Sequence, residues 1–563
     1  MAEFPHDPKE AVDRIISLDG GANSRMAGFL LPDNICESVT NLIINEPGKR
    51  VRRSGCQSFG GLVGEPGGVG EYTGGVELTD YVLGVWDDKL YRTLGSGIWE
   101  NIATDCSLVT GQLHQIVKSY HAGEPAIVAA SCSKATSLSE GINGHTKLVV
   151  FRNNTADSTN VSYAPHCICS FQGRIFGGEV EQIRWSNVAD LATFGANDSL
   201  LVEPGVGGRL TALVPARDSK PMLWVFKEKA IFMFEVRWGT PGTGGLIPSG
   251  ADALDTVNSS IRPLSVGTGC VATKSAIWVP GEEGADLFFL SDDGIRTLSR
   301  AENDVQQGAS FPLSYDIPTW IARINWTYAD LASAATFDNA YHLAVPFDGA
   351  KENTHVLRYD LRTKAWSLWE LPMRDLTVGN LGSSAKLWGV PPFATVDTSV
   401  TGAVTAAEDT PHQVYRLLTG TYDPSTDATN PVVPQFQEES KAFALKDPLV
   451  KKKFDRFTMQ LSSADTSFVA VEYRIDQGAW ASITETFIPG SSDTVTLGVD
   501  PLPWTGTSER IRRYTWNLSD YDPGYIIQFR ISSVAGATEV GKPTIYMQEL
   551  SGKQLTRDYV NDD

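Results

Sequence analysis

Residues 166–236 decide the fold, and they read HCICSFQGRIFGGEVEQIRWSNVADLATFGANDSLLVEPGVGGRLTALVPARDSKPMLWVFKEKAIFMFEV. Short apolar runs of strand length alternate there with polar turn residues, as at 167–169, 174–176 and 222–226. Gly173 and the Lys227–Glu228 pair stand between such runs and have the chemistry of tight turns. The pattern therefore predicts successive antiparallel hairpins.

The same pattern recurs between residues 61 and 420. Hairpins are predicted with centres near Asp87, Ser131, Gly173, Lys227, Asp293, Asn339 and Lys386. A spacing of roughly 50 residues is that of propeller blades. Because one four-stranded sheet cannot bury both of its faces, a closed ring of sheets is the stable arrangement. We expect an all-β protein with a β-propeller of six or seven blades. Tryptophans should fill the space between blades, namely Trp86, Trp185, Trp224, Trp278, Trp366 and Trp388.

A second kind of repeat begins after residue 446. Short alternating segments such as FDRFTMQLSS, VAVEYRI and YIIQFRISS follow one another at intervals of 10 to 20 residues. Such spacing is typical of an immunoglobulin-like β-sandwich. The expected order is an N-terminal segment (1–60) that adds strands to the propeller or a platform, the propeller (61–420), a linker (421–445) and the sandwich (446–563).

Composition limits the possible partners and chemistry. The 563 residues carry a formal charge of −20, which argues against a protein that grips nucleic-acid phosphates. The seven cysteines follow no disulfide pattern, so reduced thiols are expected. Cys167 and Cys169 could form half of a metal site, but two buried apolar side chains are the favoured interpretation. No secretory signal or membrane-length apolar run is present, and we expect a soluble protein.

Sequence motifs of catalysis are absent. There is no P-loop, no His-Glu-x-x-His, no Gly-x-Ser-x-Gly and no dinucleotide fingerprint. The stretch 291–294 is better explained as a hairpin turn than as a calcium loop. We predict a non-enzyme without cofactor or metal. Carboxylate pairs for glycoside hydrolysis are set by space and not by sequence distance, so a glycan-acting propeller hydrolase or a carbohydrate-binding adhesin is the alternative.

Several segments together carry a family resemblance. They are GGANSRMAGFLLPDNICESVTNLIINEPGKRVRRSG, which begins at Gly20, and the stretches 182–187, 207–214, 223–228, 265–267, 289–294 and 359–367. Over about residues 18–370 the chain resembles the tail nozzle, or hub, proteins of short-tailed (podovirus-type) bacteriophages. The resemblance implies a structural virion protein that forms a hexameric tail nozzle below the portal and adaptor. That nozzle would be a conduit for genome ejection and an attachment platform for tail fibres or tailspikes.

The partners and location implied by this resemblance complete the expectation. They are a homo-hexamer, the portal-proximal tail adaptor, a tail fibre or tailspike, a needle or plug protein, and genomic DNA that passes through without specific binding. The location would be the virion tail, assembled in the host cytoplasm. Acidic walls would repel phosphates and let DNA slide. Two basic clusters, Lys49, Arg50, Arg52 and Arg53 and then Lys451, Lys452 and Lys453, are predicted to contact protein partners.

Overall fold

The structure is a computed structural model that describes residues 10–555 apart from a set of gaps. The gaps are 16–17, 45–48, 63–65, 73–80, 87–88, 94–97, 104–107, 109–111, 133–147, 153–154, 157–160, 162, 189, 197, 218–220, 239–253, 255–258, 282–283, 300–310, 381–383, 393–411, 425–432, 446, 464–466, 489–510, 519–520 and 535–542. The described helical elements are short: η1 (Gly28–Leu30), η2 (Thr273–Ser275), η3 (Leu313–Asp316), α2 (Pro318–Ala322) and η4 (Ala329–Leu331). The predicted all-β class is confirmed.

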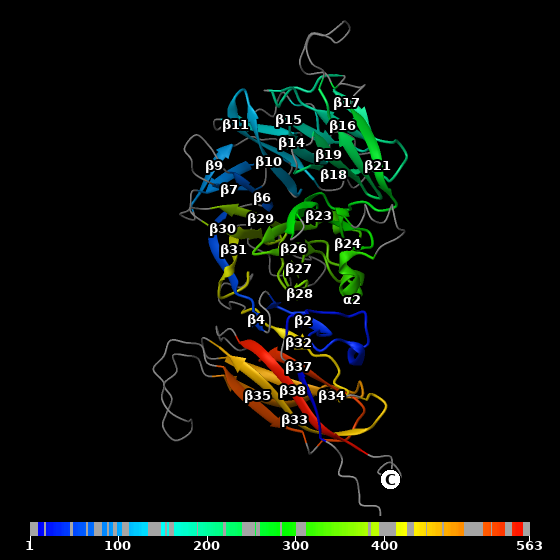
Figure 1. Cartoon of the computed structure of the whole chain (residues 1–563). Helices are drawn as coiled ribbons and strands as arrows, with labels where there is room; N and C mark the ends of the chain where they lie inside the picture. Colours follow the sequence, from blue (N-terminus) through cyan, green and yellow to red (C-terminus); the bar gives the residue numbers. More distant parts are fainter. Residues whose placement is uncertain are drawn as a thin grey trace, which may run out of the picture.

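Seven antiparallel sheets follow one another along the described part of residues 55–420, and they form a β-propeller (Figure 1). Blade 1 is β6 (Pro66–Tyr72), β7 (Tyr81–Trp86), β8 (Lys89–Thr93) and β9 (Trp99–Ala103); blade 2 is β10 (His114–His121), β11 (Glu124–Ser131), β12 (Val149–Arg152) and β13 (Thr155–Ala156). Blade 3 is β14 (Cys167–Phe171), β15 (Arg174–Gly178), β16 (Gln182–Trp185) and β17 (Ser199–Leu201); blade 4 is β18 (Leu210–Pro215), β19 (Met222–Lys227), β20 (Ala230–Glu235) and β21 (Ser260–Val266).

The remaining blades complete the ring. Blade 5 is β22 (Ile277–Gly281), β23 (Gly284–Ser291) and β24 (Gly294–Thr297); blade 6 is β25 (Ser333–Phe337), β26 (Ala340–Val345), β27 (His355–Asp360) and β28 (Trp366–Trp369). Blade 7 is β29 (Asp375–Asn380), β30 (Ala385–Val390), β31 (His412–Gly420) and β5 (Gly55–Leu62). Because β5 comes from the N-terminal part of the chain, the last blade is completed by a strand that precedes the first blade in sequence.

Contacts between neighbouring blades close the ring. The first strands β6, β10, β14 and β18 contact one another in that order, η2 contacts both β18 and β25, and β25 contacts β29. β29 in turn contacts β6, which returns the ring to its start. The predicted propeller of six or seven blades therefore has seven blades. Predicted turns are found at Gly173, after Lys227, at Asp293 and at Asn339, whereas Ser131 ends β11 and the turn of its hairpin is at Ala122–Gly123.

A β-sandwich stands at one end of the propeller (Figure 1). One sheet contains β1 (Glu10–Ile15), β3 (Leu42–Ile43), β4 (Arg50–Arg52), β33 (Lys452–Ser462), β36 (Arg512–Asn517) and β38 (Thr544–Gln554). The other contains β2 (Ser38–Thr40), β32 (Gln437–Glu439), β34 (Ser467–Ile475), β35 (Ala481–Ile488) and β37 (Ile527–Ser533). Phe457 of the first sheet stacks on Phe529 of the second, with ring centroids 3.7 Å apart, so the two inner faces form one apolar core.

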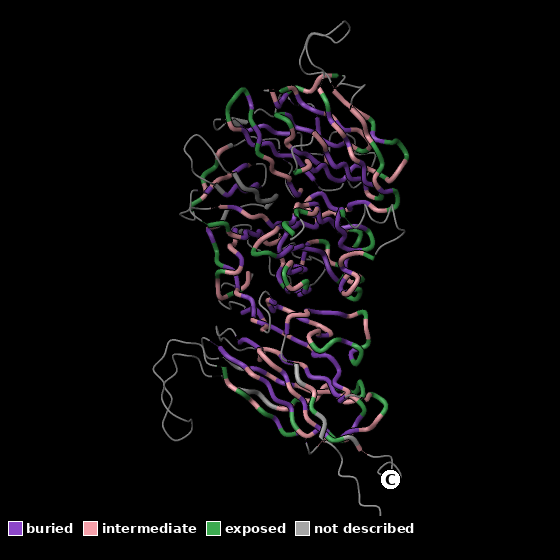
Figure 2. The backbone as a smooth tube through the Cα atoms, in the orientation of Figure 1, coloured by how far each residue is buried: buried purple, intermediate pink, exposed green. Residues whose placement is uncertain are grey.

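The short strand β2 joins the two bodies. It pairs in parallel with β28 of blade 6 on one side and antiparallel with β32 of the sandwich on the other. Blade 6 and one sandwich sheet are therefore a single nine-stranded sheet. The buried residues of both bodies follow the strands (Figure 2), and one apolar cluster runs from blades 5 and 6 into the sandwich.

The N-terminal segment and the expected linker take part in these bodies. Within residues 1–60 the strands β1, β2, β3 and β4 belong to the sandwich, and β5 belongs to the propeller. The expected linker at 421–445 is not a simple connection, because it contains β32 and the buried side chains of Phe436 and Phe443. Which strands belong to the propeller and which to the sandwich is therefore determined by long-range sheet pairing and not by sequence order.

A substitution at Gly420 tests how tightly the ring of blades is closed. It lies opposite Gly55 in the pairing of β31 with β5, and a Cβ at this position would collide with the backbone carbonyl of Cys56. We expect Gly420→Ala to lower the free energy of unfolding by about 1–3 kcal/mol, because the closing strand must move outward. Chemical denaturation measures this. The exposed neighbour variant Thr419→Ala should change stability by less than about 0.5 kcal/mol, and an equally stable Gly420→Ala would contradict the proposed tight closure.

Candidate functional site

Polar residues stand at or just before the beginning of the first strand in five of the seven blades. His114 opens β10, His166 precedes β14, Arg209 precedes β18, Ser333 opens β25 and Asp375 opens β29. The first strands of a propeller line its axis and all run in the same direction, so their beginnings meet at one end of that axis. Loops and strand ends at such a position are where propellers and barrels hold ligands. This end of the axis is the candidate site.

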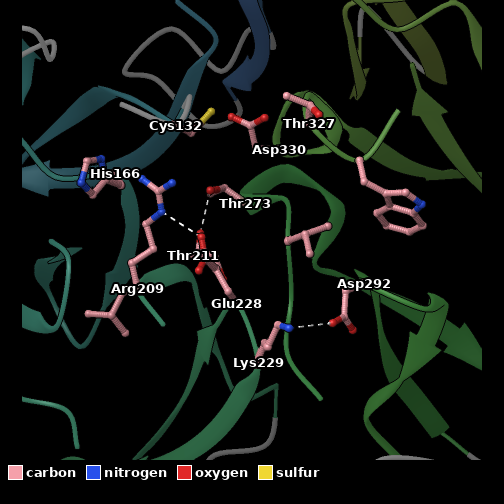
Figure 3. A pocket seen from close by; sticks show the side chains of 13 residues that line it. Cys132, His166, Arg209, Thr211, Glu228, Lys229, Thr273, Asp292, Thr327 and Asp330 are labelled. Atoms are coloured by element: carbon pink, nitrogen blue, oxygen red, sulfur yellow. Dashed lines mark hydrogen bonds and ion pairs between the residues drawn. The ribbon is translucent and has the colours of Figure 1, made fainter. Parts of the chain in front are cut away.

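A cavity of about 210 Å³ opens there, and of the five residues named above His166 and Arg209 line it. Its wall comes from blades 2 to 5 and from the loop before blade 6, and Figure 3 shows the side chains that line it. They are Cys132, His166, Arg209, Leu210, Thr211, Glu228, Lys229, Val271, Thr273, Asp292, Trp326, Thr327 and Asp330. Hydrogen-bond donors, acceptors and one large aromatic ring thus surround a single small space.

Two ion pairs hold charged side chains at the cavity wall (Figure 3). Arg209 Nε donates to Glu228 Oε1 over 3.0 Å, and Lys229 Nζ lies 3.6 Å from Asp292 Oδ2. Glu228 and Lys229 form the β19–β20 turn, and Asp292 lies in the β23–β24 turn, so the second pair links blades 4 and 5. Both pairs are partly exposed, so their main effect is on side-chain position and not on stability.

A buried ion pair lies beside the cavity. Lys274 contacts the fully buried Asp375, Ser333 Oγ donates to Asp375 Oδ1 over 2.6 Å, and Lys274 Nζ also donates to the carbonyl of His114 over 3.3 Å. These contacts connect blades 2, 6 and 7 with η2, which precedes blade 5. Burial raises the pKa of the Cys132 thiol to about 12, with smaller effects from Lys274 and Asp375. That thiol is therefore protonated at neutral pH and is no nucleophile.

Trp326 supplies the aromatic surface of the cavity. It lies on the loop before η4, its side chain is 38% exposed, and Thr327 and Asp330 accompany it on the same loop. A large indole left partly in water at a cavity wall can cover the apolar face of a ligand, while polar neighbours bond to its edge. The site therefore has the chemistry to bind a small molecule with one apolar face and many hydroxyl groups.

The sequence did not single out these residues. Trp326, Asp330 and Arg209 belong to no catalytic or binding motif, and it is the fold that brings them to one cavity. The tryptophans predicted between blades are mostly confirmed, since Trp86, Trp185, Trp224, Trp366 and Trp388 are buried. Cys167 and Cys169 are buried as predicted. Among the described residues no cluster of three or more potential metal ligands occurs.

The first basic cluster does not form the predicted partner surface. Arg50 and Arg53 are 1% exposed, Arg52 is buried as well, and Lys49 is half-buried. Arg50 Nη1 donates to Glu438 Oε1 over 2.7 Å and to the sulfur of Cys36, and Arg53 makes a two-pronged ion pair with Asp423. The prediction is corrected because these arginines bind the N-terminal segment to the sandwich and to the propeller.

The second basic cluster is corrected in part. Lys452 is fully buried, and its ammonium donates to the carbonyls of Asp447, Val450 and Tyr525. Lys451 is half-buried and Lys453 is exposed, as strand alternation requires. Of the seven basic residues, Lys453 alone is exposed. Among the described residues no helix is long and apolar enough to cross a membrane.

Comparisons with known proteins give only distant structural likenesses. No family model matches the chain, and no curated protein matches it. A glycoside hydrolase family 43 arabinoxylan arabinofuranohydrolase from Bacillus subtilis, solved with cellotetraose, is 8% identical, with 88% of this chain and 96% of that chain covered and a TM-score of 0.22. An exo-β-1,3-galactanase from Phanerochaete chrysosporium, solved with galactose, is 9% identical, with coverage of 89% and 100% and a TM-score of 0.24.

These likenesses correct the expected function. The similar solved structures named above are carbohydrate-active enzymes and not virion proteins, and on this finding the tail-nozzle function is withdrawn. At TM-scores of 0.22 and 0.24 these structures assign no function to this chain. The sequence resemblance to tail proteins, the hexamer with its adaptor, fibre and needle partners, and the virion location stay predictions. The activities of the two enzymes belong to those proteins.

The buried ion pair beside the cavity gives a stability prediction. We expect Asp375→Asn to lower the free energy of unfolding by about 3–5 kcal/mol, because it leaves Lys274 without its carboxylate partner away from water. The matched control is Asp348→Asn, which removes the partner of Arg323 in a solvent-exposed pair. Its cost should stay within about 1 kcal/mol in the same denaturant titration. Equal costs for the two variants would contradict the role of Asp375.

Proposed function

We propose that this protein is a carbohydrate-binding β-propeller whose axial cavity takes one or two sugar units of a glycan. The observation that carries the proposal is the partly exposed ring of Trp326 at the wall of a small cavity that charged and hydroxyl side chains surround. A sugar ring presents an apolar face of C–H groups and a rim of hydroxyls, and it needs both kinds of partner at once. The volume of about 210 Å³ suits a ligand of that size.

The polar groups of the cavity support this assignment. A hydroxyl group donates one hydrogen bond and accepts others, and an ion pair offers a fixed donor next to a fixed acceptor. The pairs Arg209–Glu228 and Lys229–Asp292 provide two such arrangements on one wall. Hydrogen bonds between a hydroxyl and a charged group are stronger than those between neutral groups. A site that hydrogen-bonds hydroxyl groups also discriminates strongly against ligands that lack them.

We further propose binding without hydrolysis. A glycosidase needs one carboxyl group that carries a proton and a second that acts as a base or nucleophile on the sugar. In this cavity Glu228 is bonded to Arg209, and Asp292 is paired with Lys229. Each of these two carboxylates is therefore held by a cation of the cavity wall. This supports the expectation of a non-enzyme, which stays a proposal.

The test is a glycan screen followed by calorimetry. The purified protein should bind a subset of glycans on an array, and the best ligand should bind in solution with one site per chain. Trp326→Ala should weaken that binding at least about tenfold, because a central aromatic anchor supplies much of the binding energy. No sugar should be released during incubation.

A second tryptophan offers the matched control. Trp480 lies in the sandwich between Arg474 and Arg530, far along the chain from the cavity. Trp480→Ala should keep the wild-type affinity. Wild-type affinity in Trp326→Ala, or an empty array, would refute the binding site; released sugar would refute binding without hydrolysis.

A further inference from the structure

The short element η2 contacts blades that lie on different sides of the propeller. Thr273 Oγ1 donates to the carbonyl of Thr211 in blade 4 over 2.6 Å. Lys274 Nζ donates to the carbonyl of His114 in blade 2 over 3.3 Å, and it forms the buried ion pair with Asp375 of blade 7. Two consecutive residues of η2 therefore bind three different blades.

Ser275 extends these contacts to two more blades. Its Oγ accepts a hydrogen bond from the backbone N–H of Leu290 in blade 5 over 3.1 Å, and its carbonyl accepts from the hydroxyl of Tyr341 in blade 6 over 3.1 Å. A segment of three residues reaches blades 2, 4, 5, 6 and 7 at once only from the centre of the ring. η2 therefore lies across the propeller axis as a plug.

Two cavities lie on the two sides of η2. Thr273 lines the axial cavity, whereas Ala276, which directly follows η2, lines a second cavity of about 560 Å³. Strand β18 contributes residues 210–211 to the first cavity and residues 213–215 to the second. The second cavity therefore lies further along the same strand, and η2 stands between the two.

The axial cavity has an exposed mouth and a buried floor (Figure 3). Lys229 and Trp326 are exposed, whereas Thr211, Thr273 and Cys132 are at most 8% exposed. The buried side includes η2 and the strand residue that η2 binds. Within the described part of the chain, the cavity is thus a pocket that opens at one end and stops at η2.

The side chains of this floor have already used their hydrogens. Thr273 Oγ1 donates to the Thr211 carbonyl, and Thr211 Oγ1 donates to the carbonyl of Phe226 over 3.3 Å. The Cys132 thiol donates to the carbonyl of Leu113 over 3.3 Å. A hydroxyl or thiol has one hydrogen, so each of these groups can take part in a further bond only as an acceptor.

Asp330 adds to this acceptor character. It belongs to η4, which contacts η2, and it lines the same cavity. An ionised carboxylate can only accept hydrogen bonds. The floor therefore matches a ligand tip that donates, such as a hydroxyl or an amino group, and it gives no hydrogen to a tip that can only accept.

We propose that the axial cavity recognises the end of a glycan chain, through a terminal sugar whose hydroxyl or amino groups donate to the floor at η2. This inference rests on the proposed carbohydrate binding. An internal sugar unit has neighbours on both sides, and η2 blocks one of the two directions. A terminal unit has one neighbour, which leaves the cavity through the mouth beside Trp326.

The length of the glycan provides the first test. The best ligand from the array is prepared as oligosaccharides of increasing length and as the polymer, and each is titrated in a calorimeter. We expect one bound protein per glycan chain at every length, with a molar affinity that stays within about threefold. Several proteins per polymer chain would overturn recognition of the end and leave carbohydrate binding intact. An array without any bound glycan would refute both.

Blocking each end of the glycan provides the second test. One sample is methylated on the terminal sugar at the non-reducing end, and another is converted to the methyl glycoside at the reducing end. One of these two caps should weaken binding at least about tenfold, because a methylated oxygen has no hydrogen to donate to the floor. Unchanged affinity with both caps would overturn the proposal. Terminal sugars with hydroxyl or amino groups, compared on the array, identify which donor is bound.

Variants of Thr273 test the floor itself. Thr273→Val replaces the hydroxyl by a methyl group of similar size, so it should weaken binding of the uncapped glycan at least about tenfold. The ratio of affinities for uncapped and capped glycan should also fall towards one, which a general loss of structure would not cause. Thr273→Ser, which keeps a hydroxyl, should restore this ratio. A wild-type ratio in Thr273→Val would refute the role of the floor.

Thr363→Val is the matched control. Its half-buried hydroxyl also donates to a backbone carbonyl, that of Ile44, over 3.1 Å, and Thr363 does not line the axial cavity. This variant should keep both the wild-type affinity and the wild-type ratio. A denaturant titration of each variant establishes that it is folded. Equal loss of the ratio in Thr363→Val and Thr273→Val would contradict the assignment to the floor.

Discussion

The pairing of β5 with β31 is the constraint on which the propeller depends. Without β5, blade 7 would present an unpaired edge and the ring would be joined only by packing between sheets. With it, the first and last parts of the propeller are held by backbone hydrogen bonds from a segment that also enters the sandwich. Closure and domain attachment therefore use the same stretch of chain, and the N-terminal 60 residues are the structural link between both bodies.

Features that depend on residues close together in the sequence could be predicted, and features that depend on distant residues could not. Hairpins depend on local alternation and on turn residues such as Gln172–Gly173 and Asp338–Asn339, which adopt positive φ. The all-β class, the propeller and the buried tryptophans could therefore be predicted. The fate of Arg50, Arg53 and Lys452 could not, because their partners Glu438, Asp423 and Tyr525 lie far away along the sequence or on another strand. A run of basic residues has the same appearance whether it faces solvent or an internal carboxylate.

The axial cavity could not be predicted from the sequence for the same reason. Its side chains come from the beginnings of several strands, and each is an ordinary loop residue when considered alone. Two ion pairs orient them. Arg209–Glu228 connects the beginning of β18 with the β19–β20 turn, and Lys229–Asp292 connects that turn with the β23–β24 turn. Acidic composition favours a passive conduit, whereas the paired charges at this cavity support the proposed recognition of a neutral, hydroxyl-rich ligand. Net charge describes the surface as a whole and says little about one cavity.

The single strand β2 has a mechanical consequence. Since β2 is hydrogen-bonded to β28 on one side and to β32 on the other, the propeller and the sandwich share one continuous sheet. A load applied to the sandwich would pass into blade 6 through backbone hydrogen bonds and buried arginine ion pairs. We therefore expect that whatever holds the sandwich also sets the direction in which the axial cavity points.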